Sequence, residues 1–284
     1  SPASSGKPSL PDRLLQMIGV PREENAQNTV LGAYYSRSLN SWGAEMQKAG
    51  HLEEAAAHFD LAQQLNPENV VAGVNLECNK NLQAGTSSAV TLTKSIEEKL
   101  GKYRSWEQVV NANGPYDEPA LCNAQAWIFM QTQLYRQAAQ NYHRVLQFTP
   151  DSFPSLFSLA QINLLANLPD KTLALIQEAR SRPERFRLTT TNLADLVAVE
   201  ASAWFVKKQP EKAMELLSME IQKHPDDAHL LANVVNVYTQ RGDFTNALSI
   251  VERWLKLDPD STATLINKAY ICILMRDFDA AIAT

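Results

Sequence analysis

Runs of charge of one sign are absent from this sequence. Its 284 residues hold 26 Lys and Arg against 31 Asp and Glu, which gives a formal net charge of −5. Proteins that bind nucleic acids gather Lys and Arg on one face, so this balance argues against a nucleic-acid partner. No window approaches the roughly 18 consecutive apolar residues of a membrane-spanning helix, so we expect no direct membrane insertion by this chain.

Cysteine and histidine are too few and too scattered to form a metal or disulfide framework. The three cysteines, Cys78, Cys122 and Cys272, form no CxxC pair, and the five histidines form no HxH or HExxH motif. We therefore expect no metal, no cofactor and no disulfide. Reduced, buried thiols favour a reducing compartment such as the cytoplasm, or the soluble side of a membrane protein.

What the sequence does contain is a repeated spacing. Prolines end four similar stretches, and an alanine lies twelve residues before each of them. A bulky apolar residue follows each alanine by four positions, and a small residue or valine lies 24 positions before each proline. The prolines are Pro67, Pro150, Pro225 and Pro259; the alanines are Ala55, Ala138, Ala213 and Ala247; the bulky residues are Phe59, Tyr142, Leu217 and Val251.

This pattern resembles the tetratricopeptide repeat (TPR), whose unit is a pair of antiparallel helices 34 residues long. The resemblance implies an all-α fold, a right-handed superhelical solenoid of stacked helix pairs. Small residues at positions 8 and 20 of each copy would let two helices approach. The glycine near position 15 would supply the positive φ that ends the first helix, and the proline at position 32 cannot continue the second.

The resemblance covers residues 36–284 and divides them into copies and inserts. Before them we expect a flexible tether over 1–11 and a helical extension over 12–35, with a short helix at 12–20 and one long helix at 26–49. We infer from the Ser/Pro-rich start and the uncapped end that the chain is a fragment of a longer protein. We place copies at 36–69, 70–103 (degenerate), 119–152, 153–186, 194–227, 228–261 and 262–284 (truncated), with inserts at 104–118 and 187–193.

Proteins with this repeat commonly bind partners in the concave groove formed by the first helices. Family positions 2, 5, 9, 12 and 13 carry over to residues rich in amides and aromatics and poor in charge. Amides can hydrogen bond to an extended peptide backbone through donor and acceptor groups. The candidates are Asn40, Gln47, Asn123, Trp127, Gln131, Phe157, Gln161, Phe205, His229, Asn236, Gln240, Asn267 and Tyr270; Lys48 and Ser202 occupy equivalent positions.

One specialised groove, the carboxylate clamp of some co-chaperones, matches only in part. Asn236 and Asn267 occupy its asparagine positions, but Ala232 stands where the clamp has a lysine. Without its cations such a site cannot grip a dicarboxylate strongly. A solvated inner face, or a groove filled by the protein's own segments, is the alternative for the whole groove.

Three functions remain open from the sequence. The first is a module that binds an extended peptide or a helix from a protein partner, without catalysis of its own. The second is a structural or regulatory soluble tail of a larger bacterial protein, because the first 100 residues are similar to tails of polytopic glycosyltransferase-like membrane proteins. The third, an enzyme, would need the insert 104–118 to supply a site, and that insert offers acidic and aromatic residues but no mechanism. Open solenoid ends also favour end-to-end self-association.

Overall fold

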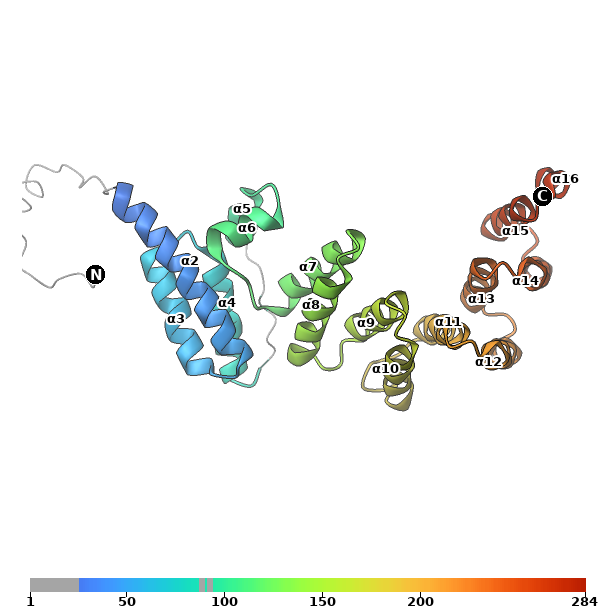
Figure 1. Ribbon diagram of the computed structural model, residues 1–284, viewed down its shortest axis with the longest axis horizontal. Helices are drawn as coiled ribbons and strands as arrows, with labels where there is room; N and C mark the ends of the chain where they lie inside the picture. The colour runs from blue at the N-terminus through green and yellow to red at the C-terminus, as the bar shows by residue number, and fades with distance from the viewer. Residues whose placement is uncertain (1–25, 87–89, 91–93) are drawn as a thin grey trace, which may run out of the picture. The chain divides into compact units, whose positions relative to one another are not determined.

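The computed structural model describes residues 26–86, 90 and 94–284. The expected tether and the expected helix at 12–20 lie outside these residues. Every regular element in the described part of the chain is an α-helix (Figure 1), which confirms the predicted all-α class. The helices are α2 (Ala26–Lys48), α3 (Leu52–Leu65), α4 (Val70–Gln83), α5 (Lys94–Gly101), α6 (Trp106–Asn113), α7 (Pro119–Gln131), α8 (Tyr135–Phe148), α9 (Phe153–Leu165), α10 (Pro169–Ser181), α11 (Thr190–Val206), α12 (Pro210–Lys223), α13 (Ala228–Gln240), α14 (Phe244–Leu257), α15 (Thr262–Leu274) and α16 (Phe278–Ile282).

The chain divides into two compact units, Ser1–Leu121 and Cys122–Thr284. In the N-terminal unit, α3 packs against both α2 and α4, and α6 lies against α2 and α4. The core of this helix trio is formed by Ala44, Ala55 and Phe59, with Met46 and Leu76 packed against them. Helix α2 runs over Ala26–Lys48 as one long helix, in agreement with the expected range 26–49.

The C-terminal unit is a stack of helix pairs. Helix α9 pairs with α10, α11 with α12, α13 with α14, and α15 with α16, as Figure 1 shows in yellow to red. The first helices of neighbouring pairs also touch, since α11 contacts both α9 and α13. One face of this unit is therefore built from first helices alone, as expected for a helical solenoid.

Burial follows the repeat positions closely. The residues at position 20 of five copies are fully buried, and they are Ala55, Ala138, Thr172, Ala213 and Ala247. Thr172 stands where an alanine would be usual, and its hydroxyl donates a hydrogen bond of 3.1 Å to the Ala160 carbonyl. The hydroxyl is thus satisfied within the core, so this departure from the pattern keeps the close helix packing.

The turn inside the pair has the same backbone conformation in six of the seven copies, where position 15 has a positive φ whether or not it is a glycine. In the degenerate copy 70–103, position 15 is Ala84 with a φ of −75°, and the positive φ falls at Gly85. The six residues and their φ angles are Gly50 (85°), Gln133 (60°), Asn167 (58°), Lys208 (59°), Gly242 (73°) and Arg276 (61°). The repeat geometry, rather than the residue type, therefore sets this turn, and four copies accept a non-glycine residue in the left-handed region.

Two regions depart from a regular repeat. Helix α11 begins at Thr190, inside the expected insert 187–193, because Thr189 forms a capping box with Asn192. The insert therefore supplies the first turn of a longer first helix. In the degenerate copy 70–103, the second helix is only the eight-residue α5. The insert 104–118 forms α6 and then the extended segment that leads to α7.

Candidate functional site: a groove lined by first helices

A hollow of about 390 Å³ lies on the first-helix face of the C-terminal unit. Its volume falls in the range of roughly 300–1,000 Å³ that is usual for ligand sites. The lining comes from α7, α9, α11 and α13, and none of it comes from second helices. The residues are Met130, Gln161, Leu164, Leu165, Ala198, Val199, Ser202, Asn233, Asn236, Val237 and Gln240.

Helical periodicity explains how the polar residues converge. Gln161, Ser202 and Asn236 all occupy position 9 of their copies, so stacking brings them to one face. Along α13, Asn233, Asn236 and Gln240 are three and four residues apart and share one side of the helix. The groove thus combines a row of amides with apolar side chains from α9 and α11, which suits a peptide backbone with an apolar side chain.

No residue that lines this groove carries a formal charge. A carboxylate contacts one lining residue: Oδ1 of Asp195 accepts a hydrogen bond from Nδ2 of Asn233 (3.0 Å) and lies 2.7 Å from Nε2 of His229. Asp195 and His229 both occupy position 2, one copy apart. This hydrogen bond holds the Asn233 side chain, and the lining itself carries no formal charge.

The four predicted aromatic residues lie on first helices and differ in exposure, and none of them lines the groove. Trp127 on α7 and Tyr270 on α15 are exposed, with 61% and 54% of their surface accessible. Phe157 is half-buried and stacks on Phe153 at 5.6 Å between ring centroids. Phe205 is also half-buried, with the Arg241 guanidinium 4.7 Å from its ring centroid. Only the first two are therefore free to meet a partner with most of their ring surface.

The remaining candidates separate into accessible and buried groups. Asn123 and Gln131 are exposed on α7, and Asn267 is half-buried on α15. By contrast, Asn40 and Gln47 are buried in the N-terminal unit, where they hydrogen bond to residues 113–117 of the same chain. In these two cases the structure differs from the expectation of an open groove residue, because a segment of the protein occupies the face.

Sequence reasoning missed Asn233 and Asp195. Asn233 occupies position 6 of its copy, as do Asn75 and Asn267 in theirs, and this shared position is the signal that could have found it. Asp195 had no such signal, since its role depends on the side chains of the next copy. The apolar lining by Leu164, Leu165 and Ala198 also becomes visible only once α9 and α11 are placed side by side.

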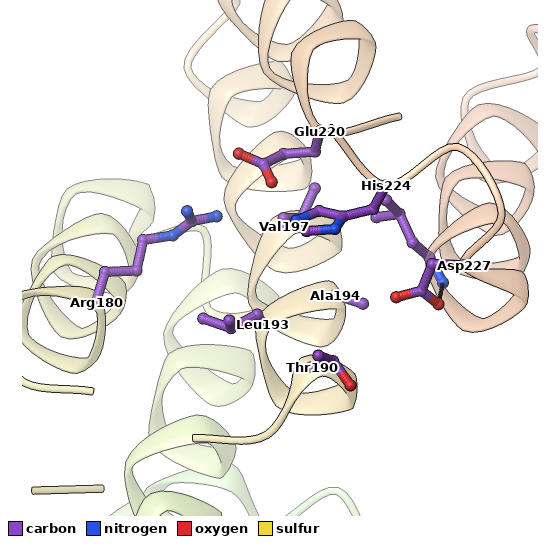
Figure 2. Close-up of a pocket in the computed structure, with 9 residues that line it drawn as sticks. Arg180, Thr190, Leu193, Ala194, Val197, Glu220, His224 and Asp227 are labelled. Atoms are coloured by element: carbon purple, nitrogen blue, oxygen red, sulfur yellow. Dashed lines mark hydrogen bonds between the residues drawn. The ribbon is translucent and has the colours of Figure 1, made fainter. Parts of the chain in front are cut away.

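A second, smaller hollow of about 80 Å³ lies among α10, α11, α12 and the start of α13. Figure 2 shows the Arg180 side chain reaching from α10 toward Glu220 and His224. Glu220 is itself paired with Lys223 at 3.0 Å. Since a water molecule takes about 30 Å³, this space suits two or three waters rather than a substrate.

Next to this hollow is a partly buried ion pair. Nη2 of Arg180 lies 3.1 Å from Oε2 of Glu200, but neither atom has hydrogen-bond geometry to any partner in the described part of the chain. Burial raises the pKa of Glu200, and the carboxylate of Glu220 adds to that rise. Arg180 and a hydrogen bond from Trp204 act in the opposite direction. The cost of removing these two charges from water therefore offsets much of the gain from their attraction.

The acidic residues of the insert serve structural contacts. Asp117 accepts a hydrogen bond from Gln47 at 2.8 Å. Glu118 accepts from the backbone N–H groups of Leu121 (2.9 Å) and Val90 (3.3 Å). A carboxylate just before the first turn of α7 also favours the positive end of that helix.

Within the residues that the structure describes, no group of three or more His, Cys, Asp and Glu could hold a metal ion. Among the same residues, even the longest helix lacks the apolar length that crossing a bilayer requires.

Comparison with known proteins gives one match to a family model. Residues 230–263 match the tetratricopeptide repeat, and this range covers most of α13, all of α14 and the first two residues of α15. Among curated proteins, the chain is similar to a Protein SGT1 homolog from Oryza sativa subsp. japonica, with 28% identity over 94 residues. That match spans 33% of this chain and 25% of the length of the rice protein.

Solved structures with a similar fold are TPR proteins. A tetratricopeptide repeat protein from Parabacteroides merdae has 13% identity and a TM-score of 0.48, and the match covers 87% of this chain and 90% of that one. YrrB, described as a TPR protein with an unusual peptide-binding site, has 12% identity and a TM-score of 0.36, over 63% and 88% of the two chains. The stacked helix pairs and the family-model match give the chain a TPR-like helical repeat fold, which is generally a protein-interaction fold.

Proposed function

We propose that this protein is a non-catalytic interaction module whose C-terminal unit binds an extended peptide segment of a protein partner. The observation that carries the proposal is the neutral groove of about 390 Å³ lined by first helices alone. Its amides can pair with the carbonyl and N–H groups of a peptide, and its apolar floor can bury one or two side chains. The preferred ligand is therefore an uncharged, extended segment with an apolar residue.

The N-terminal unit supports this mode of binding. There, asparagine side chains on first helices already hold an extended stretch of the protein's own backbone through its carbonyl and N–H groups. Asn233 and Asn267 occupy the same repeat position as Asn75, which makes two of those hydrogen bonds. The same chemistry is thus available in the C-terminal unit without an occupant of the same kind.

A peptide-display selection on the full chain tests the proposal. Peptides selected by the wild type are labelled, and their affinities are measured by fluorescence anisotropy. We expect the variant Gln161→Ala/Asn236→Ala/Gln240→Ala to bind at least tenfold more weakly, since it loses several hydrogen bonds of about 0.5–1.5 kcal/mol each.

The matched control is Gln140→Ala/Gln222→Ala, which removes exposed amides from the second helices α8 and α12. It should bind as the wild type does. Equal binding by the groove variant and the control would place the peptide elsewhere and refute the groove.

A second candidate is a structural role, in which this chain packs on another part of a larger bacterial protein, such as a glycosyltransferase-like membrane protein. Exposed apolar side chains on α2 favour it: Val30, Tyr34, Tyr35 and Trp42 are 59–69% accessible. Cross-linking of the full-length protein would decide, because contacts of α2 with other domains support this role and their absence removes it.

End-to-end self-association remains a proposal of the same kind. Ile266, Phe278 and Ile282 are 59–86% accessible on α15 and α16. Sedimentation velocity over a hundredfold concentration range tests it, and a constant monomer would reject it.

A further inference from the structure

The stretch Asn113–Asp117, which is the last residue of α6 and the extended segment after it, lies on the face formed by α2 and α4. We call it the strap. Nδ2 of Asn40 donates to the carbonyls of Asn113 (2.8 Å) and Pro115 (2.9 Å). Nδ2 of Asn75 donates to the Pro115 carbonyl at 3.0 Å, and its Oδ1 accepts from the N–H of Asp117 at 2.7 Å. Two asparagines thus bind the backbone of every second residue of the strap, at Asn113, Pro115 and Asp117.

Amides also hold both ends of the strap. Nδ2 of Asn69 donates to the Asn113 carbonyl at 3.0 Å. At the other end, Nε2 of Gln47 donates to the backbone carbonyl and to Oδ2 of Asp117, both at 2.8 Å. Asn40, Asn69 and Asn75 are fully buried, and Gln47 is 3% accessible. These four residues form a buried binding site for a peptide backbone. We call this site the amide face.

The amide face is preorganised by contacts that do not involve the strap. Nδ2 of Asn75 donates to Oδ1 of Asn40 at 2.8 Å, and Nδ2 of Asn69 donates to Oγ of Ser36 at 2.9 Å. The helices that carry these residues pack on one another around Phe59. The site therefore belongs to residues 36–75, and the strap reaches it as a ligand would.

The strap has the sequence features that such a site selects. Gly114 has a φ of 85°, and a Cβ at that position would lie 2.8 Å from the Arg37 carbonyl oxygen. Pro115 has no N–H group that needs a partner. The Tyr116 ring is buried and meets the Trp106 ring edge-on at 5.7 Å. The sequence that fits the amide face is therefore glycine, proline, an aromatic residue and aspartate, in this order.

Within the residues that the structure describes, the strap leaves one amide atom of the amide face and one beside it, on Asn79, without a hydrogen bond. Oε1 of Gln47 and Nδ2 of Asn79 are buried and have no hydrogen-bond partner in the described part of the chain. Asn79 lies one turn beyond Asn75 on α4. A peptide that continues differently after the aspartate could use them, whereas the strap turns into α7.

From these contacts we propose that the amide face is a second peptide-binding site, occupied in cis by the strap. It binds in trans an extended segment of another protein with the order Gly-Pro-aromatic-Asp when the strap leaves. This proposal is independent of the groove in the C-terminal unit, because the two sites share no residue.

The test uses the full chain and a labelled peptide with the sequence of residues 109–120, VVNANGPYDEPA. Gly114→Val in the protein should expel the strap, since valine suits neither the positive φ nor the space. We expect this variant to bind the peptide at least tenfold more tightly than the wild type does. A peptide carrying the same Gly-to-Val change should not bind.

Two further variants locate the binding. Asn75→Ala added to Gly114→Val should abolish it, whereas Gln161→Ala added to Gly114→Val should leave it unchanged. If the Gly114→Val protein keeps its helical circular dichroism and does not bind the peptide, the proposal is overturned.

A measurement on the wild type covers the case in which Gly114→Val does not fold. Millimolar peptide should accelerate hydrogen exchange at the Asp117 amide at least twofold, because the peptide displaces the strap. The Gly-to-Val peptide serves as the control, and equal exchange with both peptides would refute exchange at the amide face.

Discussion

Gly43 faces the Phe59 ring so closely that a Cβ on the glycine would lie 2.5 Å from Cε1 of the phenylalanine. Phe59 is fully buried, and it fills the space between α2 and α3. The absence of a side chain at Gly43 thus lets the aromatic ring lie directly on the α2 backbone. The residue at position 8 of this copy must therefore be small because the residue at position 24 is a large aromatic one.

Gly43→Ala should therefore destabilise the protein although alanine is the better helix former. Overpacking costs about 1–3 kcal/mol, against a helix-propensity gain of about 1 kcal/mol. Urea unfolding should show a net loss of up to about 2 kcal/mol. In a Phe59→Leu background the same change should cost less, and Gly101→Ala, whose Cβ would meet nothing within 4 Å, should show no loss.

The left-handed turns at position 15 offer a stabilising change. Lys208 and Gln133 have φ angles of 59° and 60°, a region that costs a non-glycine residue about 1–2 kcal/mol. Lys208→Gly and Gln133→Gly should each raise the free energy of unfolding by up to about 1 kcal/mol, part of the gain being offset by the entropy of the unfolded glycine. As a control, Gln140→Gly in the interior of α8 should lower stability. Loss of stability in both turn variants would mean that these turns are not strained.

Binding in the C-terminal groove should depend little on salt. None of its lining residues is charged, so ions have little attraction to screen. Raising NaCl from about 50 to 500 mM should change the affinity for a selected uncharged peptide less than twofold. A steep loss of affinity would instead indicate recognition of a charged ligand, as in a carboxylate clamp.

The raised pKa of Glu200 predicts how stability depends on pH. A carboxyl group whose pKa is higher in the folded protein binds its proton more tightly there. The contribution of Glu200 to the free energy of unfolding is therefore most favourable at pH values below the ordinary pKa of 4.5. It is lost as the pH rises through the raised pKa. Between about pH 4.5 and 7, the melting temperature of the Glu200→Gln variant should decrease less than that of the wild type. Differential scanning calorimetry can measure this difference. Parallel curves for the two proteins would contradict this origin.

Much of the fold could be predicted because the repeat positions are local rules. Ala55, Ala138 and Ala213 mark helix contacts at fixed distances along the chain, and all are buried as the spacing requires. Asn167 stands at position 15, where glycine is usual, and its φ of 58° shows that the turn forms with asparagine as well. Helix pairs of this kind depend on patterns a few residues apart, which a single sequence contains.

The occupation of the N-terminal face could not be predicted in the same way. The hydrogen bond from Asn40 to Pro115 joins residues 75 positions apart, and no periodic pattern links an amide to a backbone carbonyl. For the groove, Gln161, Asn236 and Gln240 followed from repeat positions. The contact between Asp195 and His229 forms only when two copies stack. The sequence alone does not give the distance between these two side chains.

The strap also has a consequence for synthesis of the chain. Asn75 precedes Pro115 by 40 residues, so the residues of the amide face leave the ribosome before their occupant does. At the usual rate of about 5–20 residues per second, that interval lasts roughly 2–8 seconds. For those seconds each nascent chain presents an empty, preorganised peptide site, and a segment of matching sequence on a neighbouring chain or partner could be captured before the strap arrives.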